Sequence, residues 1–285
     1  MTAAVPGPRQ AEPQRNGSLS LRRGLRLLQV VRDASADGAG LATGDLARSL
    51  GVHRSSVARL IAPLVDEGLL HRDERSRYHL GEGALLLGQA YLAGLDLRTV
   101  AAGHLRELAA GTDALCTLGE PDGTGVRVLD TVGTGPSARV RPGIGSGAVV
   151  PMYCTALGKA ILSVAPPAWT DSAVRAGLTA VTRWTITDPG ELRAELTRTR
   201  KRGFALDDRE HVPDLRSIAA PLLNHRGEVV AAVSASLPAD RMPPATMRLT
   251  ARAVMTTAHA LSHEMGAPTR TPELRESRTR GQDRG

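Results

Sequence analysis

The sequence predicts an α+β protein with two unlike domains, because the pattern of its apolar residues changes at about residue 96. Before that point, short helical patterns precede a hairpin signal. Beyond it, helices are mixed with paired strand patterns, which favours a mainly antiparallel sheet. The chain has 285 residues, 41% of them hydrophobic, which is enough for two domains that each bury a core.

Two short helices are predicted first. Apolar residues spaced three or four apart indicate a helix that Ser20 is expected to cap, and a loop with Asp and two Gly at 35–40 ends it. Thr43 is expected to cap the second helix, and Gly51 is expected to end it.

A third helix is predicted over about 53–67, with Gly68 as its C-cap. Pro63 inside it predicts a local bend or a shorter helix. The stretch LLHRDERSRYHL then places apolar ends around a charged turn at Asp73–Ser76, as in a β-hairpin. Three helices followed by a hairpin are typical of a winged helix-turn-helix, which reads double-stranded DNA.

Polar side chains gather at the start of the third helix, where such a domain enters the major groove. We expect Arg54 and Arg59 to read bases and Ser55 and Ser56 to hold phosphates, while arginines of the wing contact the DNA backbone or the minor groove. The candidate DNA-binding residues are Thr43, His53, Arg54, Ser55, Ser56, Arg59, Arg72, Arg75 and Arg77. The alternative is a small helical domain with a solvated polar face. A net charge of +7 fits an acidic partner, although charge alone is weak evidence.

Residues 81–96 form an apolar, glycine-containing pattern that suits a helix packed against a partner subunit or the next domain. Beyond it, helices are predicted for about 98–111, 155–164, 168–176, 188–202 and 245–264. Strands are predicted for about 114–119, 125–132, 214–223 and 228–237, with a Gly/Pro loop at 133–151.

The remaining composition argues against several classes of protein. Residues 1–17 lack the apolar segment of a secretory signal, and no window approaches the ~20 apolar residues of a membrane span, so we expect a cytoplasmic protein that does not bind membranes. Cys116 and Cys154 match no disulfide framework or metal spacing, so we expect buried free thiols, no metal and no cofactor. The polar ends, 1–17 and 266–285, are expected to be disordered.

The segment DDREH (207–211) raises the alternative of an enzyme. However, the adjacent carboxylates of Asp207 and Asp208 would point to opposite faces of a strand, and no H-x-x-x-H, C-x-x-C or G-x-S-x-G pattern supports catalysis. We therefore expect no enzyme, and we expect the segment to form a pocket edge with solvated charges. Lys159 is expected to anchor packing or to contact an anionic ligand.

Several dispersed motifs, in one order from about 18 to 265, resemble IclR-type transcriptional regulators. The N-terminal match lies in GVHRSSVARLIAPLVDEGLL (51–70) and YHLGEGALLLG (78–88). PMYCTALGKAIL (151–162) resembles the family's Pro-x-x-x-Thr-Ala-x-Gly-Lys-Ala segment. The same order continues in TITDPGEL (185–192), TRKRGFALDDREH (199–211) and SIAAPLLNHRGEVVAAVSAS (217–236).

The resemblance implies a winged helix domain at 18–80, a linker helix at 81–97 and a GAF-like effector-binding domain at 98–265. It also implies a homodimer or homotetramer that binds partly palindromic operator DNA. The promoter occupancy of this protein is expected to respond to a small metabolite such as a carboxylate or an aromatic acid. The alternative is a DNA-binding or assembly protein that needs no ligand.

By position, the resemblance places the effector pocket on Val150, Ala156, Leu157, Asp207, Ser217, Ser234 and Ser236. Ser234 and Ser236 lie two apart in a predicted strand, so their hydroxyls face one way. The helix beginning near 155 offers backbone N–H groups to an anion, so a small carboxylate needs no arginine there. Ser217 stands where many members have cysteine, and Val-Pro-Asp at 212–214 replaces a glycine-bearing turn. Without the resemblance, these serines are ordinary strand residues.

Overall fold

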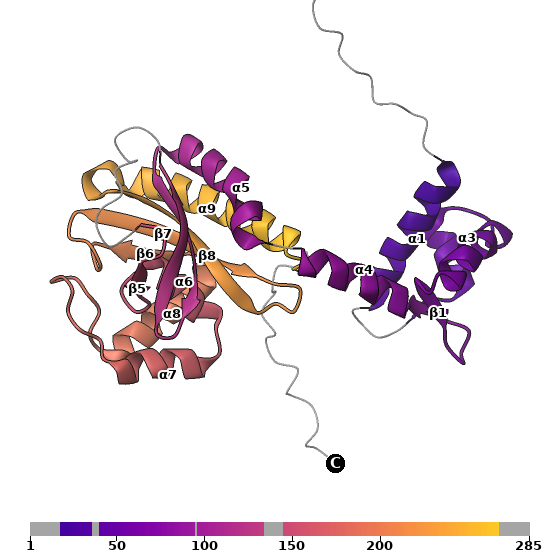
Figure 1. Ribbon diagram of the computed structural model, residues 1–285, viewed down its shortest axis with the longest axis horizontal. Coiled ribbons are helices and arrows are strands. Elements are labelled where there is room, and N and C mark those ends of the chain that lie inside the picture. Colours follow the sequence, from indigo (N-terminus) through magenta and orange to yellow (C-terminus); the bar gives the residue numbers. More distant parts are fainter. Residues whose placement is uncertain (1–17, 36–39, 95, 134–144, 268–285) are drawn as a thin grey trace, which may run out of the picture. The chain divides into compact units, whose positions relative to one another are not determined.

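The computed structural model describes residues 18–35, 40–94, 96–133 and 145–267, and it divides into two compact units at Gly94 and Leu95 (Figure 1). The tail expected at 1–17 lies outside these residues, as does the tail expected at 266–285 except for Gly266 and Ala267. None of the described helices is long and apolar enough to cross a membrane.

The first unit is a winged helix-turn-helix. Its elements are α1 (Leu19–Ser35), α2 (Thr43–Leu50), α3 (Arg54–Asp66), β1 (Leu70–Arg72), β2 (Tyr78–Leu80) and α4 (Glu82–Ala93). The apolar faces of α1, α2 and α3 meet β1 in one core, which contains Leu27, Leu46, Val57, Ile61 and Leu70. The helical spacing of these residues explains why the sequence specifies this arrangement.

Two of the expected helix caps are wrong. The N–H of Leu21 donates to the Ser18 hydroxyl at 3.3 Å, so the serine at the start of α1 is Ser18 rather than Ser20. Thr43 is the first residue of α2, and the position before it belongs to Ala42, whose N–H donates to Asp45 Oδ2 at 3.2 Å. In α2 the Asp45 carboxylate therefore takes the place of the hydroxyl cap that the sequence suggested.

The ends of α2 and α3 are closer to expectation. Gly51 ends α2 with a left-handed φ of 63°. Helix α3 continues past Pro63 to Asp66, so the proline does not shorten it by more than a residue. Gly68 adopts a left-handed φ of 67°, but the C-cap is Glu67, one residue earlier than predicted.

The second unit is built on a six-stranded antiparallel sheet in the order β5-β4-β3-β8-β7-β6. The strands are β3 (Leu115–Asp122), β4 (Gly125–Val132), β5 (Val149–Pro151), β6 (Ala205–Asp208), β7 (Leu215–Leu223) and β8 (Val229–Pro238). The helices are α5 (Leu97–Thr112), α6 (Ala156–Val164), α7 (Pro167–Ala176), α8 (Pro189–Arg202) and α9 (Pro244–Glu264), with a short 3-10 helix, η2 (Ala239–Arg241). This confirms the α+β class and the antiparallel sheet.

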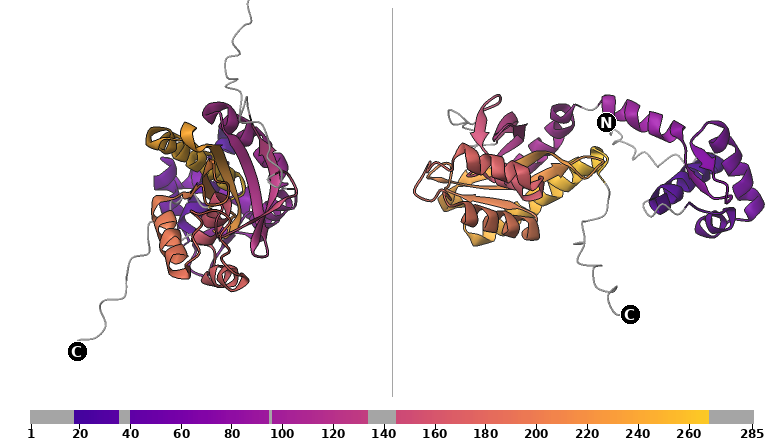
Figure 2. Two further views of the ribbon diagram at one scale, coloured as in Figure 1. Left: turned by 90° about the vertical axis from the view of Figure 1, so that its left-hand side faces the viewer. Right: turned by 90° about the horizontal axis from the view of Figure 1, so that it is seen from below.

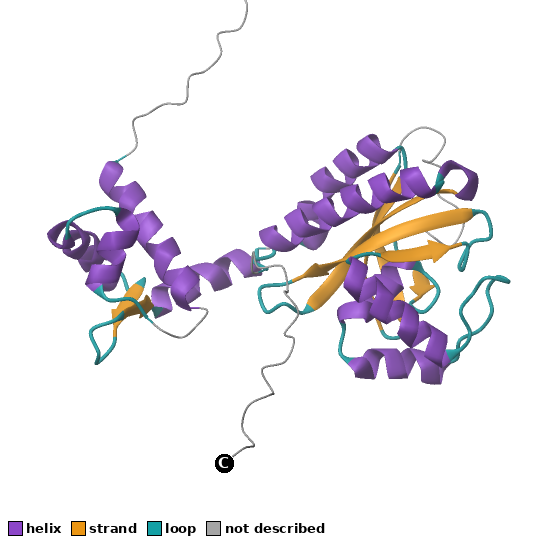
Figure 3. Ribbon diagram, turned by 180° about the vertical axis from the view of Figure 1, so that it is seen from behind, coloured by secondary structure: helices purple, strands orange, loops and turns teal. Residues whose placement is uncertain are grey.

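Helices cover both faces of this sheet. Helices α5 and α9 lie together on one face, and α6, α7 and α8 lie on the other (Figures 1 and 3). Figure 2 shows the same two helical layers from other directions. Alternate residues of β7 and β8 therefore enter different cores: Ile218 and Val233 face α5 and α9, whereas Ala219 and Ala232 face α6.

Two short strands were not predicted from the sequence. Strand β5 lies at the end of the segment expected to be a loop. Strand β6 was absent from the predicted strands, although its two aspartates were treated as strand residues. Unlike the hairpin strands β1 and β2, which a charged turn marks, these strands of three and four residues contain too few alternations to be recognised, and their formation depends on pairing with β4 and β7.

Candidate functional site

The start of α3 presents the polar face expected of a recognition helix. Val57 and Ile61 are buried in the core, which leaves Arg54, Ser55 and Arg59 exposed. His53 occupies the N-cap position: its Nδ1 accepts the N–H of Ser55 at 3.4 Å and lies 2.9 Å from the Ser55 hydroxyl. His53 and Ser55 therefore stabilise the helix start, a role that the sequence analysis did not assign.

Arg54 lies across the turn between α2 and α3. A Cβ atom added to Gly44 would lie 3.0 Å from Arg54 Nη2, so the guanidinium rests against the first turn of α2, next to Thr43. Ser56 is half-buried and is less accessible than Ser55. The structure thus brings Thr43, Arg54 and Ser55 to one end of the helix-turn-helix.

The wing carries the three predicted arginines in different environments. The Arg72 guanidinium stacks on the Tyr78 ring, 5.9 Å from its centroid. Arg77 Nη1 donates to the Gly40 carbonyl at 2.8 Å, so this side chain holds the wing to the segment before α2. Arg75 is exposed at the turn. Arg77 therefore has a structural contact that the sequence did not indicate.

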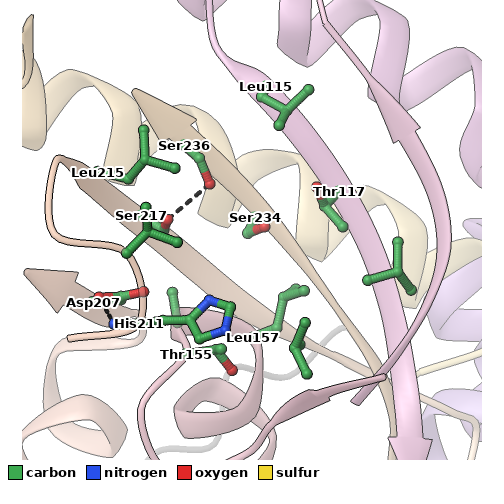
Figure 4. Close-up of a pocket in the computed structure, with 14 residues that line it drawn as sticks. Leu115, Thr117, Thr155, Leu157, Asp207, His211, Leu215, Ser217, Ser234 and Ser236 are labelled. Atoms are coloured by element: carbon green, nitrogen blue, oxygen red, sulfur yellow. Dashed lines mark hydrogen bonds between the residues drawn. The ribbon is translucent and has the colours of Figure 1, made fainter. Parts of the chain in front are cut away.

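A pocket opens on the face of the sheet that α6 covers, with an empty volume of about 530 Å³ that includes open solvent (Figure 4). All seven residues that the resemblance assigned to an effector pocket line it: Val150, Ala156, Leu157, Asp207, Ser217, Ser234 and Ser236. The other lining residues are Leu115, Thr117, Val128, Thr155, His211, Val212 and Leu215. Alternation along β3 places Leu115 and Thr117 on one face, and this signal could have identified them.

The strand register produces rows of polar side chains across the pocket floor. Asp207 pairs with Ser217, Ser217 with Ser236, and Ser236 with Leu115. The hydroxyls of Ser217 and Ser236 are 2.8 Å apart and hydrogen-bonded (Figure 4). The neighbouring pair, Thr117 and Ser234, is almost fully buried, and no hydrogen bond to another described residue involves either hydroxyl.

One wall of the pocket is the start of α6. The Thr155 hydroxyl caps this helix by accepting the N–H of Gly158 at 3.1 Å, and it donates to the Pro151 carbonyl at 2.6 Å. The N–H groups of Ala156 and Leu157 precede that capped position and have no carbonyl one turn earlier within the helix. They are the donors that an anion at this wall would use.

Asp207 of β6 also lines the pocket. Its Oδ1 atom accepts the N–H groups of Glu210 at 2.7 Å and His211 at 3.3 Å, which shapes the loop between β6 and β7. Burial raises the pKa of the Asp207 carboxyl to about 7, although the Lys159 charge opposes this shift. Burial also lowers the pKa of His211, which favours its neutral form.

The expected role of DDREH as solvated charge is wrong for Glu210. Glu210 is only 7% exposed and forms a buried ion pair with Lys159, which is fully buried. Lys159 therefore anchors the fold, one of its two expected roles, and does not line the pocket. Asp208 points away from Asp207, as predicted, and pairs with Arg216 at 2.9 Å.

The two cysteines are buried free thiols, as predicted. Burial raises the pKa of both Cys116 and Cys154 to about 12, so neither thiol ionises near neutral pH. Within the described residues, no group of three or more His, Cys, Asp or Glu side chains is placed to hold a metal ion.

Comparison with known proteins identifies the chain at the level of its family. Residues 20–74 match the family described as "IclR helix-turn-helix domain", and residues 89–263 match "Bacterial transcriptional regulator IclR C-terminal". The chain belongs to the IclR family. The protein is therefore a DNA-binding transcriptional regulator and not an enzyme.

Individual relatives agree with this assignment. The IclR-family chain is 32% identical over 253 residues to the HTH-type transcriptional regulator BhcR of Paracoccus denitrificans, covering 87% of this chain and 88% of BhcR. It is 30% identical over 253 residues to the acetate operon repressor of Salmonella typhimurium, covering 85% and 90% of the two chains. The crystal structure of the Agobacterium tumefaciens repressor BlcR shares the fold, with a TM-score of 0.76, 24% identity and coverage of 88% and 99%.

Proposed function

We propose that this IclR-family regulator binds a partly palindromic operator as a homodimer, or as a homotetramer made from such dimers, in the cytoplasm. A small carboxylate or aromatic acid in the pocket changes its promoter occupancy. The observation that carries the effector assignment is that all seven residues assigned by the family resemblance line one pocket. This observation favours effector control over the alternative of an assembly protein without a ligand.

The DNA-contacting surface consists of the start of α3 and the wing. Arg54 and Arg59 contact base edges, while Thr43, Ser55 and Ser56 contact phosphates together with the free N–H groups at the start of α2. The exposure of Arg54, Ser55 and Arg59 supports these roles. His53 holds the start of α3, and Arg72, Arg75 and Arg77 present positive charge along the wing.

The dimer forms through α4. Leu85, Leu86, Leu87 and Tyr91 are between 56% and 65% exposed, which is unusual for consecutive large apolar residues on a helix. A second copy covers this surface most simply, because a two-fold dimer uses the same patch twice and matches a palindromic operator. Residues 81–97 connect the winged helix domain (18–80) to the effector domain (98–265). A change in pocket occupancy is transmitted to the DNA-binding domain through this connection.

The first experiment is a footprint of the full chain on the DNA flanking its own gene, at two salt concentrations and against random competitor. A protected, roughly palindromic site that survives competitor supports operator recognition. Diffuse binding that salt removes contradicts it, because counterion release alone then accounts for the affinity. The same DNA serves to test whether small acids alter protection.

A further inference from the structure

The pocket lining contains a carboxyl group and, apart from the imidazole of His211, no basic side chain. Its fourteen lining residues include Asp207 and His211 but neither Arg nor Lys. The nearest buried cation, Lys159, is already paired with Glu210. A carboxylate ligand therefore has no cation to balance its charge, and it would share the pocket with a second carboxyl group. Two adjacent carboxylates of this kind are stable only when they share a proton.

The geometry shows where that proton would reside. Asp207 is 5% exposed, and its Oδ1 atom is occupied by the N–H groups of Glu210 and His211. Its Oδ2 atom has no hydrogen-bond partner among the described residues. A proton on Oδ2 converts this acceptor into a donor that faces the pocket.

We propose that the pocket binds a carboxylate effector together with one proton, which is held between the effector and Asp207. The N–H groups of Ala156 and Leu157 accommodate one side of the ligand carboxylate, and the Asp207 O–H donates to the ligand. This inference rests on the proposed function, and it adds that alkaline conditions weaken the effector signal.

Other titratable groups surround Asp207. They are Lys159 on α6, Cys154 before α6, and Glu210 and His211 in the following loop, while Glu195 of α8 acts on the Lys159–Glu210 pair. The opposite charges of Lys159 and Glu210 offset each other. His211 has a lowered pKa and Cys154 a pKa of about 12, so both remain neutral in mildly alkaline solution.

The direction of the pH effect follows from the free protein. Since burial raises the pKa of Asp207 to about 7, the free protein already carries the proton below that pH, and the affinity is constant there. Above it, binding must take up a proton, and the affinity falls about tenfold per pH unit. Between about pH 6 and about pH 8.5 the expected loss is roughly thirtyfold.

The test is calorimetric titration of the full chain with acetate, lactate and benzoate, and with acetamide, lactamide and benzamide as uncharged counterparts. The variant is Asp207→Asn, whose Oδ1 can keep the loop hydrogen bonds and whose Nδ2 donates at any pH. The matched control is Asp208→Asn, because Asp208 pairs with Arg216 outside the pocket. Thermal unfolding of each variant checks that it is folded.

We expect an acid that binds wild type at low pH to lose roughly thirtyfold in affinity at high pH, and its amide to lose none. Asp207→Asn should abolish this loss, and Asp208→Asn should retain it. Equal acid affinity at both pH values in wild type overturns the proposal, as does an equal loss in Asp207→Asn. Failure of all three acids to bind overturns it too, whereas the operator footprint separately decides the proposed function.

Discussion

Removing the buried cation Lys159 without its partner is expected to destabilise the C-terminal unit strongly. The Lys159 side chain is fully buried, and that of its partner Glu210 is 9% exposed. In Lys159→Met the unbranched methionine retains most of the packing volume. The carboxylate of Glu210, however, is left out of water without a counter-charge.

The size of the effect follows from this burial. Breaking a buried ion pair by removing one partner costs about 3–5 kcal/mol. For a folded unit of the size of Leu95–Gly285, this corresponds to a fall in Tm of roughly 6–20 °C.

The loss should also depend on pH. Burial raises the pKa of Glu210 and the Lys159 charge opposes this shift, so without Lys159 the pKa in the folded state rises further above its value in the unfolded chain. The folded state then binds the proton more tightly, so the destabilisation is smallest in acid and grows as the pH rises.

Urea unfolding followed by tryptophan fluorescence measures this effect selectively. Trp169 and Trp184 are the only tryptophans in the sequence, and both belong to the C-terminal unit. The matched control is Lys201→Met, because Lys201 is the only other lysine and is exposed on α8. We expect this control to change stability by less than about 0.5 kcal/mol.

The double variant Lys159→Met/Glu210→Met should recover most of the lost stability, because it leaves neither charge unpaired. The reasoning is refuted if Lys159→Met unfolds at the same urea concentration as the Lys201→Met control. It is also refuted if the double variant is no more stable than the single one.

Three further experiments, the last of them on a pair of variants, have expected outcomes. Arg54→Ala should weaken operator binding by about 1–3 kcal/mol and relax specificity at one base position, and unchanged affinity in a gel-shift titration would rule out the base contact. Ser234→Ala/Ser236→Ala should reduce the thermal shift caused by any effector acid while leaving operator affinity intact; an unfolded variant would instead assign these serines to the core. Gly158→Ala should destabilise the C-terminal unit by more than about 2 kcal/mol, since its Cβ would lie 2.2 Å from backbone atoms before α6. Gly103→Ala on α5, where no described atom beyond its own stretch of helix lies within 4 Å of the added Cβ, should stabilise by about 0.5–1 kcal/mol, and equal urea midpoints for the two variants would contradict this packing argument.

The sequence was sufficient for the helices of both units and for the central strands. Their apolar residues repeat over many positions, so periodicity alone identifies them. The same local geometry explains why Ser234 and Ser236 could be assigned to one face of β8. Helix caps were less predictable, since several polar residues near the start of each helix can act as the cap. The hydroxyl of Ser18 rather than Ser20 accepts an N–H at the start of α1. At the start of α2 the Asp45 carboxylate, not the Thr43 hydroxyl, accepts the N–H of Ala42.

Contacts between distant residues could not be read from the chain. Asp207 faces Ser217 because β6 pairs with β7 in one register. Strand β6 is too short to be identified from the alternation of its residues. Lys159 and Glu210 are 51 residues apart, and neither has a local pattern that marks it as buried. Local periodicity therefore accounts for the elements and for the direction of their side chains. The pairing of strands and the packing of α6 on the sheet create the pocket and its buried charges, because only these long-range contacts remove the carboxyl groups from water.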